Sequence, residues 1–143
     1  MEGTTDAAVP VVDGYDILEK VDVGGTSVVW RAVEAASGRI VAVKTLLPRL
    51  AEDVEERRAF FDEAVIMAGL DHPGIVKGYA HGVCGNVWYN ALEFVDGYAF
   101  SDFLRRKGRV SEADCLLIAE SVASALDYAW RRHGIVHCDI KPE

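Results

Sequence analysis

The hydrophobic pattern of the chain changes once, at Asp96–Gly97, from short runs rich in β-branched residues to segments with helical spacing. This change constrains the fold most, because β-branched runs are typical of strands and a 3.6-residue period is typical of helices. Five strands are predicted before the break, at 17–23, 27–33, 40–46, 75–83 and 87–93. One helix interrupts them and further helices follow the break, so an α+β fold is predicted.

The first three strands are predicted to form an antiparallel meander. Residues 34–39, between the second and third strands, contain the small residues and glycine typical of a hairpin turn. Residues 84–86 carry a similar turn signal between the last two strands. The helix predicted at 52–69 has acidic residues in its first turn and Gly69 at its end. Its apolar residues recur at helical spacing: Val54, Phe60, Phe61, Ala64, Met67 and Ala68.

The second half of the chain is predicted to be helical, first briefly at 101–106 and then over 111–133. Ser111 and Asp114 resemble a capping box at the start of the long helix, and Gly134 is the expected stop. One apolar stripe follows this helix: Cys115, Ile118, Ala119, Val122, Leu126, Ala129 and Trp130.

Charge and cysteine content exclude several classes of function. The 143 residues carry a net charge of −8 and no Lys/Arg cluster beyond short runs, so a nucleic-acid partner is not expected. Cys84, Cys115 and Cys138 lack the spacing of a zinc site, and we interpret them as reduced thiols of a cytoplasmic protein. Residues 1–12 have neither a basic nor an apolar signal segment and are expected to form a flexible leader. No membrane segment is expected.

The last seven residues carry the most specific chemical signal: His137, Cys138, Asp139, Ile140, Lys141, Pro142 and Glu143. They resemble the catalytic loop of protein kinases, in which His-Arg-Asp is followed four residues later by Asn. The resemblance implies that Asp139 accepts the proton of a substrate hydroxyl and that Lys141 contacts the phosphate, as in serine/threonine kinases. Cys138 replaces the usual Arg, so regulation through a phosphorylated activation loop is not expected. The metal-binding Asn would come next, so we expect an incomplete and inactive part of a kinase domain.

Residues 21–29, between the first two strands, resemble the kinase glycine-rich loop G-x-G-x-x-G-x-V. They are Val21, Asp22, Val23, Gly24, Gly25, Thr26, Ser27, Val28 and Val29. Gly24 and Gly25 are expected to let the backbone approach nucleotide phosphates, because glycine has no Cβ and permits positive φ. Asp22 and Ser27 replace the first and third glycines. Taken alone, a Gly-Gly hairpin is also typical of an ordinary turn.

Ala42-Val43-Lys44 resembles the kinase strand V-A-x-K. Because side chains alternate along a strand, Ala42 and Lys44 share one face. The resemblance implies that Ala42 and Val29 cover the adenine and that Lys44 holds the phosphates. Glu63 resembles the kinase helix glutamate that pairs with this lysine. It lies among apolar residues of the predicted helix, where an unpaired carboxylate is unfavourable, and a Lys44 partner would resolve this. The alternative is a Glu at the edge of the apolar face with its carboxylate in water.

Two further segments resemble kinase connections. Glu93 and Val95 correspond to the hinge, where backbone groups would face the adenine edge. Residues 70–76 resemble the link L-x-H-P-x-I-V, which makes His72 a structural residue. Asn90 is polar where the family prefers an aliphatic side chain, so it needs a hydrogen-bond partner.

The resemblance covers Tyr15 to Glu143 and implies a protein-kinase-like fold. That fold has a five-stranded antiparallel N-lobe with one helix, followed by the first helices of a helical C-lobe. Residues 13–95 would form the N-lobe and hinge, and residues 96–143 a partial C-lobe.

The function implied is transfer of the γ-phosphoryl group of ATP, with Mg²⁺, to Ser or Thr of a protein substrate. Most magnesium ligands of the family have no counterpart here, and no metal ligand is assigned. The alternatives are a nucleotide-binding pseudokinase and a regulatory interaction module. The apolar stripe of the long helix is expected to be exposed, which predicts self-association through this helix or a mobile second half.

Overall fold

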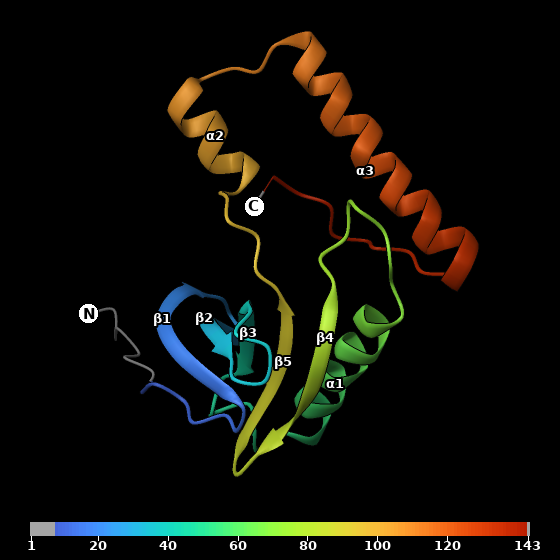
Figure 1. Cartoon of the computed structure of the whole chain (residues 1–143). Coiled ribbons are helices and arrows are strands. Elements are labelled where there is room, and N and C mark those ends of the chain that lie inside the picture. The colour runs from blue at the N-terminus through green and yellow to red at the C-terminus, as the bar shows by residue number, and fades with distance from the viewer. Residues whose placement is uncertain (1–7, 143) are drawn as a thin grey trace. The chain divides into compact units, whose positions relative to one another are not determined.

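The protein, seen in a computed structural model, is described over residues 8–142. Its strands are β1 (Tyr15–Val23), β2 (Ser27–Glu34), β3 (Ile40–Leu46), β4 (Gly78–Cys84) and β5 (Val87–Glu93). The helices of the described part are α1 (Val54–Ala68), α2 (Phe100–Lys107) and α3 (Glu112–His133) (Figure 1). The predicted α+β class and element order are confirmed.

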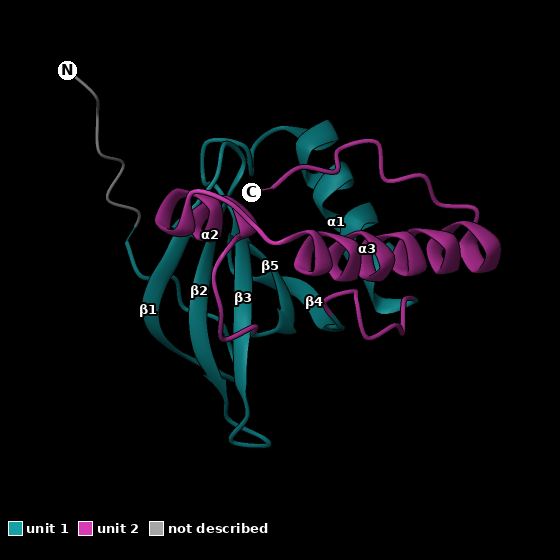
Figure 2. Cartoon of the chain, turned by 90° about the horizontal axis from the view of Figure 1, so that it is seen from above, with its two compact units in different colours: residues 1–69, 77–94 teal, residues 70–76, 95–143 magenta. Residues whose placement is uncertain are grey.

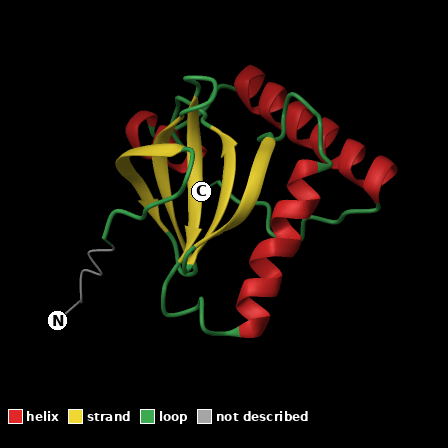
Figure 3. Cartoon of the chain, turned by 60° about the horizontal axis from the view of Figure 1, so that its bottom comes forward, coloured by secondary structure: helices red, strands yellow, loops and turns green. Residues whose placement is uncertain are grey.

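The strands form one antiparallel sheet, drawn in yellow in Figure 3. Their order in the sheet is β1-β2-β3-β5-β4. The predicted meander is therefore present, and the hairpin of β4 and β5 joins it along β3. Val29 lies opposite Lys44 on β3, and Lys44 lies opposite Asn90 on β5. These three residues follow one row across the centre of the sheet.

The main core cluster lies on β2 and β3. Its buried members are Val12, Val28, Trp30, Ala32, Val41, Val43 and Leu47. The indole Nε1 of Trp30 donates a hydrogen bond of 3.0 Å to Oγ1 of Thr45, which satisfies a buried polar pair. The expectation that the flexible leader extends to residue 12 is wrong at its end. Val12 is only 3% exposed and belongs to the core. Residues 1–7 of that leader lie outside the described part of the chain.

Helix α1 begins at Val54, two residues after the predicted start, because Asp53 caps it. The Asp53 carboxylate accepts hydrogen bonds from the N–H groups of Glu55 and Glu56. Phe60 and Ala64 are its buried residues. Val54 was expected on the apolar face but is 67% exposed at the first position of the helix.

Strand β4 begins at Gly78, three residues later than predicted. Ile75 is β-branched, but its N–H donates to the carbonyl of His72 in a turn instead of pairing with β5. The sequence of residues 75–77 predicts a strand, but the turn at Pro73–Gly74 directly before them prevents one from forming there.

The chain divides into two compact units (Figure 2). The first contains the chain up to Gly69 together with Lys77–Phe94, and the second contains Leu70–Val76 together with the chain from Val95. Segment 70–76 therefore groups with the helical part, although it precedes β4 in sequence.

In the second unit, α3 is capped as predicted. Oγ of Ser111 accepts from the N–H of Asp114 at 3.1 Å, and Gly134 ends the helix with a φ of 66°. Ala125 and Ala129 are its buried residues, whereas Ile118 and Trp130 of the predicted stripe are exposed. No helix of the described residues is long and apolar enough to cross a membrane.

His72 connects segment 70–76 to α3, as expected of a structural residue. Its Nε2 lies 3.2 Å from Oγ of Ser124, and its ring lies 5.3 Å from the ring of Tyr128. The phenol of Tyr128 accepts a hydrogen bond from the N–H of Asp71 at 3.1 Å.

Candidate active site

The glycine-rich hairpin closes with a hydrogen bond of 2.8 Å from the N–H of Gly24 to the carbonyl of Ser27. A Cβ on Gly24 would make only ordinary contacts, and one on Gly25 would meet nothing within 4 Å. Neither residue adopts the left-handed conformation that glycine permits. Their use is therefore an open approach to the backbone at the hairpin tip.

A segment after β3 holds the hairpin tip. The guanidinium of Arg49 donates a hydrogen bond of 2.6 Å to the carbonyl of Gly25, and the N–H of Leu47 donates one of 2.9 Å to the carbonyl of Thr26. Sequence reasoning missed both contacts, because a basic or apolar residue after a strand carries no signal for a partner more than twenty residues away.

Ala42 and Lys44 lie on the same face of β3, as the alternation predicts. Ala42 is buried opposite Leu92 of β5, and Lys44 lies between Val29 and Asn90 in the sheet register. The Lys44 side chain is 19% exposed, so it extends from a largely covered position. A small residue next to a cation leaves room for an apolar ring beside an anionic group.

The predicted pair of Lys44 and Glu63 is present. Nζ of Lys44 lies 2.6 Å from Oε1 and 2.8 Å from Oε2 of Glu63, so both carboxylate oxygens accept hydrogen bonds from the ammonium. The ammonium also lies 5.7 Å from the ring centroid of Phe60, within cation–π range. Only the fold brings the two charges together, since 19 residues separate them in sequence.

Glu93 ends β5, and Val95 follows it as an exposed residue of the second unit. The N–H of Glu93 donates to the carbonyl of Lys77 at 2.8 Å, and the N–H of Lys77 donates to Oε2 of Glu93 at 3.2 Å. The N–H of Glu93 is thus already paired, so a ligand contact at this residue must use the carbonyl group.

Asp139 and Lys141 lie together in the second unit. Nζ of Lys141 is 3.2 Å from Oδ2 of Asp139, and both side chains are exposed. The N–H of Asp139 donates to Nδ1 of His137 at 3.2 Å, and the carbonyl of Pro142 accepts from the N–H of Ser101 at the start of α2. These contacts fix a short loop that presents a carboxylate and an ammonium side by side.

A comparison with protein family models matches residues 15–143 to the protein kinase domain. The chain belongs to the protein kinase family. The serine/threonine-protein kinase PknJ of Mycobacterium tuberculosis is 38% identical over 92% of this chain, and PrkC of Bacillus subtilis is 35% identical over 90%. The crystal structure of the M. tuberculosis PknI kinase domain matches with a TM-score of 0.78 and 28% identity.

These relatives are named serine/threonine-protein kinases, which assigns the chain to the serine/threonine branch of the family. The chain spans about a fifth of the length of PknJ and PrkC, 22% and 20% respectively. It covers 54% of the PknI kinase domain structure, and that match includes 93% of this chain. The kinase-like fold predicted from sequence is therefore shown.

Besides Asp22 and Ser27 of the glycine-rich loop, Asn90 and Cys138 depart from the kinase pattern. Asn90 is 3% exposed, and its Nδ2 donates to the backbone carbonyl of Phe60 at 3.5 Å. The buried amide thus has the partner that the sequence required. Cys138, at the position of the usual Arg, is exposed and adopts a φ of 62°.

Kinases use ATP with Mg²⁺. Among residues 8–142, no group of three or more His, Cys, Asp or Glu side chains could hold a metal ion. The nearest cation to the Asp139 carboxylate is Lys141 of the same loop. The described residues therefore do not fit a complete magnesium site, and no magnesium ligand is assigned to them.

Proposed function

We propose that this segment binds ATP and supplies the catalytic carboxylate of a serine/threonine protein kinase. The observation that carries the proposal is the ion pair of Lys44 with both carboxylate oxygens of Glu63. An ammonium held in this way cannot swing freely, so it is already oriented when an anionic phosphate arrives. A strand lysine that extended into solvent would not contact both carboxylate oxygens of a helix residue.

In this proposal the first unit holds the nucleotide. Lys44 contacts the phosphates, and Glu63 orients Lys44. The hairpin of residues 21–29 covers the phosphates with its backbone, because Gly24 and Gly25 leave the tip open. Ala42, from the same strand face as Lys44, packs against the adenine.

Val29, beside Lys44 in the sheet register, completes this apolar surface. The carbonyl of Glu93 and the backbone of Val95 accept and donate hydrogen bonds at the adenine edge. Hinge recognition then depends on main chain, which tolerates changes of side chain at both positions.

The second unit supplies the chemistry of transfer. The carboxylate of Asp139 accepts the proton of a Ser or Thr hydroxyl as its oxygen attacks the γ-phosphorus and ADP leaves. Lys141, 3.2 Å from that carboxylate, offsets the negative charge of the transferring group. Residues 13–95 are assigned to the N-lobe and hinge, and residues 96–143 to the start of the C-lobe.

The three cysteines of the chain are free thiols, which supports a reducing cytoplasmic location for this reaction. Phosphoryl transfer is proposed for the whole kinase domain, since the chain covers 54% of the PknI domain. The 143 residues alone are expected to bind nucleotide without transferring phosphate.

Calorimetric titration with ATP and with adenosine tests the nucleotide site. Replacing Lys44 by Met should lower ATP affinity about tenfold or more, because a hydrogen bond to a charged group is lost. Adenosine affinity should stay the same, because adenosine carries no phosphate. The matched control Lys107→Met removes an ammonium from the end of α2 and should change neither affinity. Equal ATP affinity in the Lys44→Met variant would contradict the proposal.

A nucleotide-binding pseudokinase remains the second candidate, favoured by Cys138 at the position of the usual Arg and by Asp22 at the first glycine position of the loop. A complete kinase domain carrying this segment distinguishes the two. We expect it to phosphorylate a generic protein substrate and Asp139→Asn to lower kcat by about 10²- to 10⁴-fold. ATP binding without phosphate incorporation would favour the pseudokinase.

A further inference from the structure

Helix α1 contacts the neighbouring strands on both sides of Glu63. Phe60 lies three residues before Glu63 and Met67 four residues after it, so each is about one helical turn away. Phe60 is contacted from β5 and Met67 from β4. A rigid helix held at both positions cannot rotate or tilt at Glu63 without breaking one of the two contacts.

The contact with β4 depends on a glycine. A Cβ on Gly78 would lie 3.0 Å from the backbone N of Ala68, 3.0 Å from the backbone C of Met67 and 3.2 Å from its carbonyl oxygen. These distances are tighter than ordinary van der Waals contact, and the atoms met belong to the helix backbone. The strand therefore approaches the last turn of α1 with its own backbone, and a side chain at this position requires the strand or the helix to shift.

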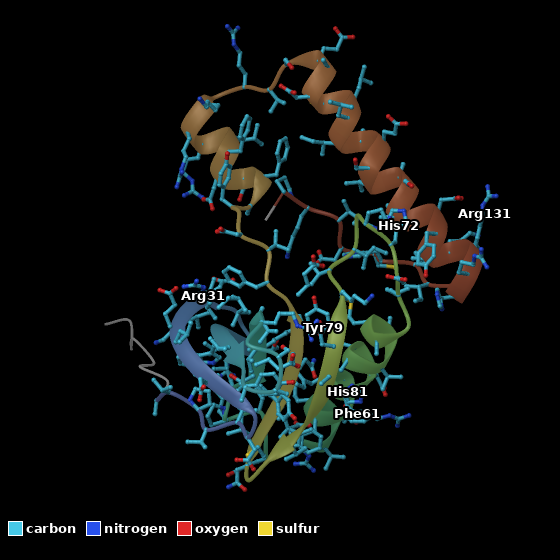
Figure 4. The ribbon with its side chains drawn as sticks, viewed as in Figure 1. Arg31, Phe61, His72, Tyr79, His81 and Arg131 are labelled. Carbon is cyan, nitrogen blue, oxygen red and sulfur yellow. The ribbon has the colours of Figure 1, made fainter. Side chains whose placement is uncertain are left out.

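The contact with β5 is made by a buried amide. Nδ2 of Asn90 donates to the carbonyl of Phe60 at 3.5 Å, and Asn90 lies directly opposite Lys44 in the sheet register. Asn90 thus lies beside Lys44 in the sheet and also contacts the helix that carries Glu63. On β4, His81 lies opposite Asn90 and meets Phe61 edge-on, with ring centroids 4.8 Å apart (Figure 4).

We propose that Gly78 and Asn90 are positioning residues for the Lys44–Glu63 pair, holding α1 against β4 and β5 one turn after and one turn before Glu63. This inference rests on the proposed ATP site, since the pair matters through the phosphates. Neither residue touches nucleotide in this scheme. Both act through Glu63, which predicts that their effects disappear when Glu63 no longer carries a charge.

Gly78→Ala and Asn90→Leu test the proposal in the 143-residue chain. Each should lower ATP affinity by roughly 3- to 10-fold, in the range of coupling between residues in contact, and leave adenosine affinity unchanged. Gly97→Ala is the matched glycine control, because its Cβ would meet only Val95 at 3.8 Å. Asn86→Leu is the matched control for Asn90→Leu, because Asn86 lies in the exposed turn between β4 and β5. It should also leave ATP affinity unchanged.

A double-mutant cycle with Glu63→Gln separates positioning from general stability. In the Glu63→Gln background, Gly78→Ala and Asn90→Leu should cost no further ATP affinity. The inference is overturned if the two substitutions lower ATP affinity by the same factor in the Glu63→Gln variant as in the unmodified chain. A parallel loss of adenosine affinity also overturns it, because the residues would then act through the fold as a whole.

Hydrogen exchange gives a readout that needs no nucleotide. Both variants should speed exchange of α1 amides around Glu63, while β2 and β3 stay protected and the two controls match the unmodified chain. Unchanged exchange in α1 overturns the inference even if ATP does not bind. Failure of the unmodified chain to bind ATP counts against the proposed function, and exchange then still decides whether Gly78 and Asn90 hold the helix.

Discussion

At the residue scale, the Lys44–Glu63 pair orients the Lys44 ammonium without adding much to the stability of the fold. The Glu63 side chain is 50% exposed, so water screens much of its attraction to Lys44. The pair therefore contributes little to the free energy of unfolding, although it fixes the direction of the ammonium.

We expect Glu63→Gln to change the free energy of unfolding by no more than about 1 kcal/mol, because the half-exposed carboxylate is screened by water. ATP affinity should fall in the same variant. Urea denaturation and calorimetry measure the two effects, with Glu120→Gln on the exposed surface of α3 as the charge control. Destabilisation well above that range would show that the pair is structural.

A second residue-scale prediction concerns pH. Hydrogen bonds from Ser37 and then from Arg39 hold the pKa of Glu34 below its ordinary value of 4.5. A carboxylate with a lowered pKa stabilises the folded state above pH 4.5, and this contribution is lost as the pH falls through its folded pKa. Below pH 4.5, Tm should therefore fall more steeply in the unmodified chain than in Glu34→Gln. Parallel curves would contradict this, and added salt should reduce the difference.

Residue patterns predicted Lys44 and Glu63 but missed Gly78 and Arg49. Lys44 and Glu63 were found through their resemblance to the lysine and glutamate of the kinase pattern, supported for Glu63 by its place among apolar helix residues. The contact at Gly78 is a close approach of two backbones, and that of Arg49 joins the segment after β3 to the hairpin. Such contacts depend on tertiary packing, which local patterns do not contain.

At the element scale, caps and turns decided where prediction succeeded. Ser111 and Gly134 were predicted to mark helix ends, because their side-chain or backbone chemistry satisfies unpaired backbone groups locally. The Asp53 cap of α1 was not predicted, and the predicted start of that helix was two residues too early. The start of β4 was missed because pairing with β5, rather than the β-branched Ile75, determines where the strand begins.

The Asp53 cap gives an element-scale prediction. Asp53→Ala should destabilise the protein by about 0.5–2 kcal/mol, because two N–H groups at the start of α1 lose their acceptor. Glu52→Ala, one residue earlier and outside the cap, should change stability far less. Thermal and urea denaturation measure both variants, and equal stabilities of the two would show that Asp53 does not hold the end of α1.

At the scale of the whole molecule, the two units differ in how their apolar residues are covered. The first unit buries a continuous cluster on β2 and β3, among them Val28, Val41 and Val43. In the second unit, Leu116 and Leu117 of α3 are 64% and 62% exposed, and α2 and α3 border an apolar hollow of about 470 Å³. Local periodicity predicted the helix and its apolar stripe, but which of these residues are covered depends on neighbours that the pattern does not specify.

This contrast predicts that the 143-residue chain self-associates through α3 and exchanges its amides faster there than in the sheet. Sedimentation velocity should show a larger species at higher protein concentration, and replacing both Leu116 and Leu117 by Ser should return the chain to monomer. Changing the exposed Val9 and Val11 to Ser is the matched control, because it removes apolar surface elsewhere and should leave association intact. A monomer at all concentrations, with α3 as protected as β2 and β3, would show instead that the exposed leucines are tolerated as ordinary surface.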